Sequence, residues 1–305
     1  LKGEYLHEQG FNGENMTIAV CDDGFSNANN NPGYSHIFNT NRILGTYDYV
    51  RSDSMVYNVG GHGSNCLSFI GGLISDKYIG TATKSKFYLF RTENSAADYE
   101  SLQEEFNLAA ALERCSQVGV DVVSISLGYL KFNRDTFPDH DTSDLRKNIT
   151  PAAVAVNLAS SRGILVCVAA GNKDFTQYIN TPADADSAFA IASVNINGVP
   201  AGSSSEGLPN DPRVKPNVAA VGANSTYIST TGVIIPSGQG TSYATPQIAG
   251  LSACLWQAFP TKTNWEIKTA IEQSASQYLT PDKKIGYGIP DFKKAYQLLS
   301  STTYV

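Results

Sequence analysis

The sequence predicts an α/β fold in which a doubly wound, mostly parallel sheet is covered by helices on both faces. Short apolar runs that do not alternate with polar residues predict strands buried on both sides, as parallel strands are. Stretches with helical spacing of apolar residues separate these runs, and this alternation is typical of a parallel sheet. The predicted strands cover residues 17–21, 87–90, 120–127, 164–169 and 189–194.

Helices are predicted where apolar residues recur at three or four positions. Leu102, Phe106 and Ala109 belong to such a pattern over residues 101–118, and a second pattern covers residues 151–162. A third helix contains Pro246. Because proline is tolerated in the first turn, where N–H groups lack intrahelical partners, this helix is expected to be capped at about Ser242.

The composition predicts one domain with a large core. The chain has 305 residues, 42% of them hydrophobic, and no linker or charge run divides it. We therefore expect a single domain over residues 1–305, with its core at about 17–299. The net charge of −6 argues against a nucleic-acid partner. No run reaches the roughly 18 apolar residues of a membrane span, and the start at Leu1 without a signal pattern fits a trimmed product.

A serine stands where a glycine-flanked loop turns into the third helix. The segment 240–250 reads GTSYATPQIAG, with Ser242 at its third position. Free backbone donors and the positive end of the helix dipole are expected around this hydroxyl, an environment that suits a nucleophile. Alternatively Ser242 is only an N-cap, since serine is among the preferred residues there.

An aspartate and a histidine lie upstream in similar settings. Asp22 ends the strand 17–21, where open α/β sheets place their sites, although Asp-Asp-Gly also forms turns. His62 lies in GGHGSNC (60–66), and an imidazole accepts a proton near neutral pH, as a general base must. A metal site at His62 is disfavoured, because Cys66 on the next turn is expected to point toward the core.

In the chain order Asp22, His62, Ser242, these segments resemble the aspartate, histidine and serine motifs of the subtilisin-like serine proteases, the subtilases. The run 164–172, which ends in Ala-Gly-Asn, resembles the oxyanion-hole motif of the family. The resemblance spans about residues 17–299. It implies a subtilisin-like fold with Asp22, His62 and Ser242 as the triad and Asn172 as the oxyanion donor.

The motifs depart from the family pattern beside the expected catalytic residues. Asp23 stands where Ser or Thr is usual, so the triad carboxylate is assigned to Asp22 and Asp23 is expected to be a solvated or hydrogen-bonding neighbour. Ser64 and Asn65 follow His62 where relatives usually carry Thr-His. Neither substitution alters His62, the expected general base.

The resemblance also implies substrate-binding positions. The segment containing Gly128 would pair with the substrate as an added strand, and this glycine would leave room for the approach. Lys173 would lie at the rim of the pocket for the residue before the cut and disfavour a cationic residue there, unless Asp174 cancels its charge. The expected substrate-binding residues are Ser126, Leu127, Gly128, Ala169, Ala170, Gly171 and Lys173.

The acidic segment 91–100 allows two interpretations. It lies where relatives wall the pockets for residues two to four before the cut, so Glu93, Asp98 and Glu100 would favour basic side chains there. The alternative is a solvated loop that leads into the acidic first turn of the helix at 101–118. The sequence favours this alternative.

No cofactor or metal is required by the predicted chemistry. Calcium is a frequent structural ligand in subtilases, but the connection 73–80 lacks the Asn-rich insertion of their strong site. The acidic loop 181–186 could bind calcium weakly. Five cysteines, at 21, 66, 115, 167 and 254, cannot all pair, so buried free thiols are expected. Thiol control of the triad through Cys21 or Cys66 is the alternative.

The predicted function is serine endopeptidase activity on exposed, extended polypeptide through an acyl-enzyme intermediate. A peptide ligase or macrocyclase would use the same intermediate, and a catalytically silent binding protein could share the scaffold. The resemblance further implies an inhibitory pro-segment before maturation. It also implies secretion, or a location at the cell surface or in the periplasm.

Overall fold

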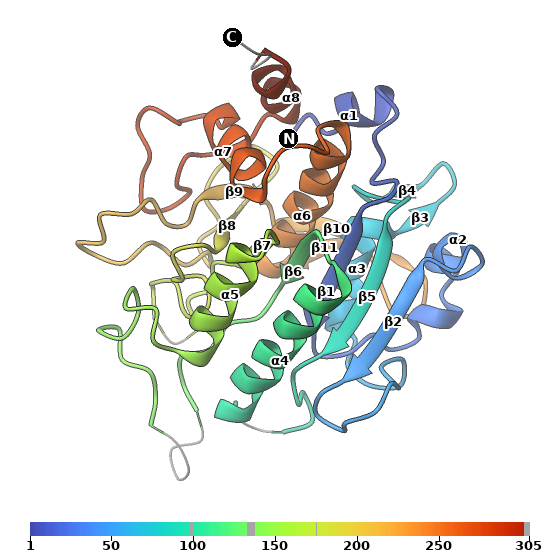
Figure 1. Cartoon of the computed structure of the whole chain (residues 1–305), viewed down its shortest axis with the longest axis horizontal. Coiled ribbons are helices and arrows are strands. Elements are labelled where there is room, and N and C mark those ends of the chain that lie inside the picture. The colour runs from blue at the N-terminus through green and yellow to red at the C-terminus, as the bar shows by residue number, and fades with distance from the viewer. Residues whose placement is uncertain (98–99, 133–137, 175, 302–305) are drawn as a thin grey trace.

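The computed structural model describes residues 1–97, 100–132, 138–174 and 176–301, and its centre is a seven-stranded sheet (Figure 1). Every neighbouring pair of strands in this sheet is parallel. The order across the sheet is β2 (Ile43–Asp48), β5 (Lys86–Arg91), β1 (Thr17–Asp22), β6 (Val122–Ile125), β7 (Leu165–Ala169), β8 (Phe189–Val194) and β9 (Val218–Val221).

Helices cover both faces of the sheet. On one face lie α3 (His62–Gly71) and α6 (Thr241–Ala258), and on the other lie α4 (Leu102–Val118) and α5 (Pro151–Ser161), as Figure 1 shows. The predicted doubly wound, parallel architecture is confirmed, and so are the predicted helices at 101–118 and 151–162. The remaining helices are α1 (Glu4–Glu8), α2 (Ser35–Phe38), α7 (Asn264–Ser274), α8 (Phe292–Ser301) and the 3₁₀ helices η1 (Ala28–Asn30) and η2 (Pro32–Tyr34).

Each face of the sheet has its own hydrophobic core. Along β1, Ile18 and Val20 belong to the cluster that includes the buried faces of α3 and α6. Ala19 and Cys21 belong to the cluster that includes α4 and α5. Both sets of side chains are shielded from water, which explains why the strand shows no alternation of polar and apolar residues.

The sequence patterns missed β2, β9 and two small antiparallel pairs. β2 is an edge strand whose residues are mostly half-buried or exposed, so it lacks the continuous apolar run of the inner strands. β9 has only four residues, two of them alanine. The antiparallel pairs are β3 (Leu73–Ile74) with β4 (Tyr78–Ile79), and β10 (Ala223–Ile228) with β11 (Ile234–Gln239).

α6 begins one residue before Ser242, so the prediction that this serine caps the helix is wrong. The N-cap is Gly240, whose φ of 135° glycine adopts without strain. Pro246 lies inside the helix and not in its first turn. It deprives the Ser242 carbonyl of its helical donor, and that carbonyl accepts instead from the Ser126 hydroxyl at 3.0 Å and from Cys66 Sγ at 3.4 Å.

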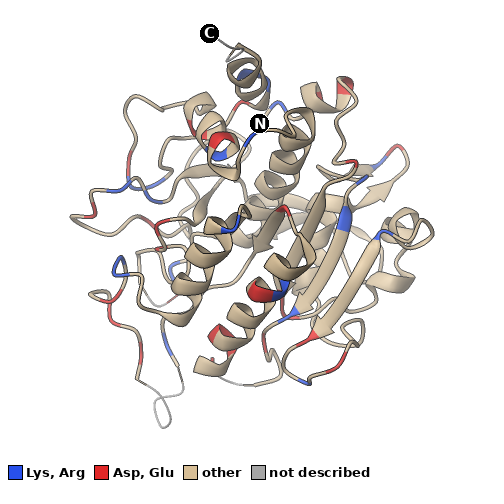
Figure 2. Ribbon diagram, viewed as in Figure 1, with Lys and Arg blue, Asp and Glu red and all other residues tan. Residues whose placement is uncertain are grey.

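Charged residues are dispersed over the molecule. Figure 2 shows Lys and Arg scattered among Asp and Glu, with no continuous basic stripe on the visible ribbon. Within the described ranges, none of the helices combines the length and the apolar character that crossing a lipid bilayer requires.

The path of the chain creates a crevice at the carboxyl end of β1. After β1 the chain moves out to the edge strand β2, returns through α3 to β5, and then crosses through α4 to β6 on the other side of β1. The two strands that flank β1 are therefore reached by helices on opposite faces of the sheet. In open α/β sheets such a reversal leaves a ligand-binding crevice outside the carboxyl ends of the strands.

A buried ion pair ties the carboxyl ends of three strands together. Nη1 of Arg91, the last residue of β5, lies 2.9 Å from Oδ2 of Asp48 at the end of β2, and the two side chains are 3% and 0% exposed. Nε of the same guanidinium donates to the carbonyl of Asp23, just after β1, at 3.0 Å.

We predict that Arg91→Met lowers the free energy of unfolding by about 3–5 kcal/mol, because it leaves the Asp48 carboxylate buried without its cation. Chemical denaturation in a Ser242→Ala background, which lacks the expected nucleophile, measures this change. Lys86→Met removes a positive charge from the half-buried start of β5 and should cost less than about 0.5 kcal/mol. Equal effects of the two substitutions would contradict a role of the ion pair in stability.

Candidate active site

Asp22 and His62 form a hydrogen-bonded pair at the carboxyl end of β1. Nδ1 of His62 lies 2.7 Å from Oδ1 of the fully buried Asp22 carboxylate. The same oxygen accepts the backbone N–H of Asp23 at 2.9 Å, whereas Oδ2 has no hydrogen-bond partner among the described residues. A carboxylate at Nδ1 holds a proton there and leaves Nε2 as the basic nitrogen of the neutral ring.

Asp23 positions the helix that carries His62. Its Oδ1 accepts the backbone N–H of Gly63 at 3.1 Å, and its Oδ2 accepts that of Gly61 at 3.3 Å. These groups lie at the N-terminus of α3, where backbone donors lack helical partners and an anion is favoured by the helix dipole. Burial and the adjacent Asp22 raise the pKa of Asp23. Asp23 is therefore a hydrogen-bonding neighbour, one of the two roles expected from the sequence.

The basicity of His62 is set by two opposing effects. Burial disfavours the charged imidazolium and lowers the pKa of His62. The Asp22 carboxylate and the Cys66 sulfur favour that charged form and together outweigh burial, so the pKa ends well above its usual value. The ring also stacks on Tyr243, with 5.8 Å between the ring centroids.

Cys66 contacts the imidazole from one turn along α3. Its Sγ lies 3.7 Å from Nδ1 and 3.8 Å from Nε2 of His62. As expected from the sequence, this thiol is fully buried and packs with Phe69, and it also contacts the imidazole. Burial raises its pKa to about 11, so at neutral pH the thiol keeps its proton and donates to the Ser242 carbonyl. All five cysteines are free and buried, as predicted.

Ser242 lies in the first turn of α6 and borders the same cavity as Asp22 and His62. Its hydroxyl donates to the carbonyl oxygen of Ser126 at 3.3 Å, a long contact that a χ1 rotation would release. Its side chain lies in a largely buried setting, with 8% of the residue exposed. The three residues predicted as a triad are therefore brought together at one cavity.

Asn172 is held against the start of α6 through its amide oxygen. Oδ1 accepts the backbone N–H of Thr241 at 2.9 Å and the Thr241 hydroxyl at 3.1 Å. With its oxygen engaged in this way, the amide presents Nδ2 as a donor beside the residue that precedes Ser242. The Thr241 hydroxyl also accepts the backbone N–H of Gly171 at 3.2 Å, which links this segment to the end of β7.

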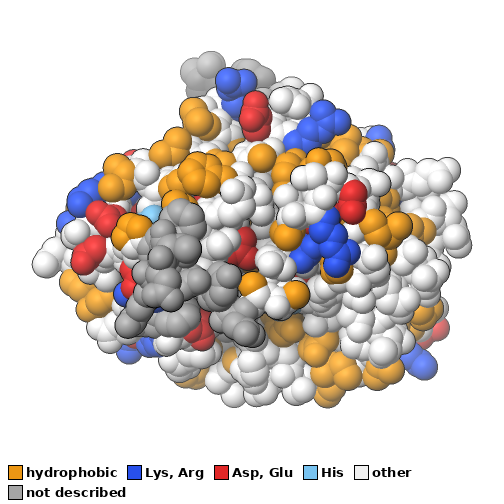
Figure 3. All heavy atoms as spheres, turned by 90° about the horizontal axis from the view of Figure 1, so that it is seen from below, with side chains coloured by type: hydrophobic (Ala, Val, Ile, Leu, Met, Phe, Trp, Pro, Cys, Tyr) orange, Lys and Arg blue, Asp and Glu red, His pale blue; other side chains and the backbone are white. Residues whose placement is uncertain are grey.

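The cavity at this end of the sheet has a volume of about 580 Å³. Figure 3 shows the molecule from below, the side toward which β2 and β5 point in Figure 1, and acidic side chains are among those visible there. Of the expected substrate-binding residues, Ser126 and Leu127 line this cavity. Those outside its lining are Gly128, Ala169, Ala170, Gly171 and Lys173, and Asn172 is outside it too.

Gly128 and Gly171 both adjoin a residue that the sequence analysis did not single out. A Cβ built on Gly128 would clash with the side chain of Asn180, and one built on Gly171 would lie 3.2 Å from Oδ1 of the same residue. This Oδ1 is buried and has no hydrogen-bond partner among the described residues. Gly128 thus makes room for Asn180, and its expected role in leaving room for the substrate stays a prediction. No motif in the chain marks Asn180.

Lys173 is already paired with an acidic residue. Its Nζ lies 2.9 Å from Oε1 of Glu206, and both side chains are partly buried. Its backbone N–H donates to the Ser205 hydroxyl at 3.1 Å. The partner that compensates the lysine is therefore Glu206 and not the adjacent Asp174, which weakens the expected repulsion of a cationic substrate residue.

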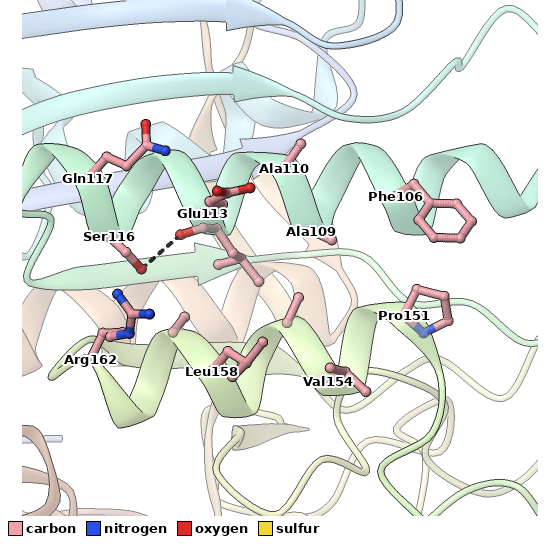
Figure 4. Close-up of a pocket in the computed structure, with 13 residues that line it drawn as sticks. Phe106, Ala109, Ala110, Glu113, Ser116, Gln117, Pro151, Val154, Leu158 and Arg162 are labelled. Atoms are coloured by element: carbon pink, nitrogen blue, oxygen red, sulfur yellow. Dashed lines mark hydrogen bonds between the residues drawn. The ribbon is translucent and has the colours of Figure 1, made fainter.

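A larger hollow lies away from this site. It has a volume of about 800 Å³ and runs between α4 and α5, as Figure 4 shows. Phe106, Val154 and Leu158 line it together with the charged Glu113 and Arg162. None of the predicted site residues borders it.

Two side-chain clusters among the described residues have the composition of a metal site. One consists of Asp22, His62 and Cys66, and the other of Glu93, Glu100 and Glu104. In the first cluster the protonated thiol is a poor ligand.

In the loop 181–186, which could bind calcium weakly, the carboxylates are engaged by other groups. Asp184 accepts the backbone N–H of Arg146 at 2.8 Å, and Asp186 pairs with the guanidinium of Arg213. Each carboxylate therefore already has a protein donor, although one oxygen of Asp184 has no partner among the described residues.

The subtilase family model matches residues 13–288 of this chain. The chain belongs to the subtilase family. A thermostable alkaline protease of Halalkalibacterium halodurans is 28% identical to it, over 96% of this chain and 71% of that protein. A subtilisin of Bacillus pumilus is also 28% identical, over 97% of this chain and 96% of that protein. These relatives and the family support serine protease activity, and they confirm the resemblance seen in the sequence.

Among solved structures, the crystal structure of MycP1 with its N-terminal propeptide removed has the same fold as this subtilase. The TM-score is 0.76 and the sequence identity 22%, and the match covers 100% of this chain and 97% of that one.

We predict that kcat/KM of this subtilase rises with pH through a midpoint above the ordinary value of about 6.5 for histidine. The protonated imidazole cannot accept a proton, and Asp22 keeps His62 protonated to a higher pH than usual. Asp22→Asn should lower kcat by about 10⁴ and move the midpoint to lower pH, because burial then acts without the opposing carboxylate. Peptide hydrolysis assayed from about pH 5 to about pH 10 measures both effects. The same midpoint in both proteins would contradict this account of His62.

Proposed function

We propose that this subtilase is an endopeptidase that hydrolyses exposed, extended polypeptide through a Ser/His/Asp triad. The observation that carries the proposal is the convergence of Asp22, His62 and Ser242 on one cavity. The hydrogen bond that His62 Nδ1 makes to the Asp22 carboxylate also supports the proposal. It leaves Nε2 of the imidazole free to accept the serine proton.

Each side chain has a definite part in the reaction. The Ser242 hydroxyl turns from the Ser126 carbonyl toward Nε2 of His62, which takes the proton as Oγ bonds to the substrate carbonyl carbon. The C–N bond breaks when the imidazolium returns that proton to the leaving amine. A water molecule then attacks the acyl-enzyme and gives a proton to His62, and the C–O bond to Ser242 breaks as the imidazolium returns that proton to Oγ. Asp22 remains ionised and stabilises the imidazolium.

The negative charge that develops on the substrate carbonyl oxygen needs preorganised donors. Asn172 supports this role, because its amide oxygen is held by Thr241 and its Nδ2 is left to donate. The backbone N–H of Ser242 lies in the first turn of α6, where amides lack helical partners. We assign these two groups to the oxyanion hole.

The substrate backbone would lie along residues 126–128. This segment follows β6, outside the strand pairs of the central sheet, and Ser126 and Leu127 line the cavity. An extended peptide could add to it as a further strand. A polypeptide substrate also fits the subtilase family, whose members are made with propeptides, so we expect an inhibitory pro-segment and a site of action outside the cytoplasm.

The alternatives share the scaffold and differ in chemistry. A peptide ligase would pass the acyl group to an amine, and no feature of the described cavity favours an amine over water. A silent binding protein would not need a buried carboxylate bonded to the imidazole. Labelling by a fluorophosphonate, followed by mass analysis of peptide products, separates the three.

We predict that Ser242→Ala lowers kcat by about 10⁶, the magnitude known for subtilisin itself, because the triad acts as a unit. The variant should lose fluorophosphonate labelling while its unfolding free energy and peptide affinity persist. Ser252→Ala is the matched control: it lies in the same helix, and its buried hydroxyl has no partner among the described residues. If Ser242→Ala keeps more than a few per cent of the activity, Ser242 is not the nucleophile.

We predict that Asn172→Ala lowers kcat by about 10²–10³ with little change in KM, the loss known for the corresponding donor of subtilisin. Steady-state kinetics on one peptide substrate measure the two constants separately. Thr241→Val, which removes one of the two contacts to the Asn172 oxygen but keeps the backbone N–H, should have a much smaller effect. A loss confined to KM would place Asn172 in substrate binding instead.

A further inference from the structure

Three glutamates line the cavity that holds Asp22, His62 and Ser242. Glu93 follows β5, and Glu100 and Glu104 lie before and within the first turn of α4. One carboxylate oxygen from each lies within 4.8 Å of the others. Glu93 and Glu104 are only 6% and 4% exposed. We call these residues the glutamate cluster.

Both carboxylate oxygens of Glu104 already accept hydrogen bonds from the protein. Its Oε1 accepts the backbone N–H of Asn94 at 2.7 Å, and its Oε2 accepts that of Ser101 at 2.6 Å in the capping box of α4. These contacts fix a carboxylate in the wall of the cavity and satisfy both of its oxygens.

Glu93 and Glu100 keep free acceptor oxygens. Glu93 uses one atom, Oε1, for both the Tyr129 hydroxyl at 2.6 Å and the Thr92 hydroxyl at 2.8 Å, and its Oε2 has no partner among the described residues. Oε2 of Glu100 is buried and also lacks a partner there. A buried acceptor without a donor is costly, so Oε2 of Glu100 favours a ligand that donates, and Oε2 of Glu93 is left to accept from the same ligand.

No described cation neutralises the cluster. Lys131 lines the same cavity, but its Nζ lies 2.9 Å from Oδ2 of Asp139. Burial and the neighbouring Glu104 raise the pKa of Glu100 to about 8, and the same two causes raise the pKa of Glu93 well above its usual value. Glu93 and Glu100 therefore hold a proton more readily than ordinary carboxyl groups do, and a cation beside them would favour their ionised forms.

We propose that Glu93, Glu100 and Glu104 form a subsite that binds a lysine or arginine side chain of the polypeptide substrate. This inference rests on the proposed function, because it requires a peptide in the cavity. The sequence favoured a solvated loop for residues 91–100. The burial of Glu93 and Glu104 reverses that preference, and residues 98 and 99 of the segment lie outside the described residues.

A substrate cation fits the cluster better than a metal ion does. Calcium takes about six to eight oxygen ligands in a close cage. Here Glu104 has both oxygens engaged by backbone donors, and Glu93 has one engaged by two hydroxyls. The space in front of them is part of a cavity of about 580 Å³, which suits a long side chain that enters from a bound peptide.

The test compares peptides that differ in one charge. Lysine is exchanged for norleucine, and arginine for citrulline, at each position on both sides of the cleaved bond. At one position we expect the basic residue to raise kcat/KM about tenfold over its neutral counterpart, and Glu100→Gln to reduce that ratio to about twofold. Glu113→Gln makes the same charge change on α4 but borders the hollow of Figure 4, and it should leave the ratio unchanged.

The possible results distinguish a failure of the glutamate subsite from a failure of the proposed protease function. Norleucine peptides that are cut with no preference for lysine at any position would overturn the subsite and leave the proposed function intact. A preference that survives Glu100→Gln would also overturn it. If fluorophosphonate does not label Ser242 and no peptide is cut, the proposed function fails. The subsite is then judged by whether the Ser242→Ala protein binds lysine peptides more tightly than norleucine peptides.

A calcium titration tests whether the glutamate cluster binds a metal ion instead of a basic side chain. A melting temperature that rises with CaCl₂, falls again with a chelator, and is insensitive to both in Glu100→Gln would identify the cluster as a metal site. Together with no preference for lysine, that result would overturn the proposal. An unchanged melting temperature with a preference for lysine would support it.

Discussion

The strands of the central sheet all run in one direction, and the site depends on this constraint. Parallel strands bring their carboxyl ends to a single edge, so residues that are far apart in the sequence meet there without any long loop. Asp22 ends β1, Glu93 follows β5, Ser126 follows β6 and Asn172 follows β7. Ser242 and His62 arrive differently, each in the first turn of a helix.

Two adjacent carboxylates, those of Asp22 and Asp23, position the imidazole of His62 in different ways. Asp22 contacts the ring directly and fixes which nitrogen carries the proton. Asp23 contacts the backbone of α3 and so fixes where the helix that bears the ring begins. The carbonyl of Asp23 is in turn held by Arg91, whose guanidinium is paired with Asp48. The position of His62 therefore depends on buried charges that extend back to the edge strand.

The sequence predicted the inner strands, the helices at 101–118 and 151–162 and the candidate triad, because each has a strong local signal. Continuous apolar runs mark strands buried on both faces, and Ser101 with Glu104 forms a capping box that starts α4. The edge strand β2 and the hairpins lack such signals, because solvent covers one side of them.

Features that depend on contacts between distant segments could not be predicted. The start of α6 was misplaced because Pro246 is tolerated there only through Ser126 and Cys66, which the local sequence does not reveal. The position of Asn180 between two glycines and the burial of Glu93 are likewise tertiary properties.

Helix ends ordinarily fray, because their outermost amide and carbonyl groups exchange protein partners for water. The first turn of α6 is protected from this. The Ser242 carbonyl is bonded to α3 through Cys66 and to the end of β6 through Ser126, and the preceding N–H is bonded to Asn172. Opening this turn would require breaking contacts to three other segments at once. Amide hydrogen exchange there should therefore follow the opening of the whole domain, which would keep Ser242 on a slowly opening part of the fold.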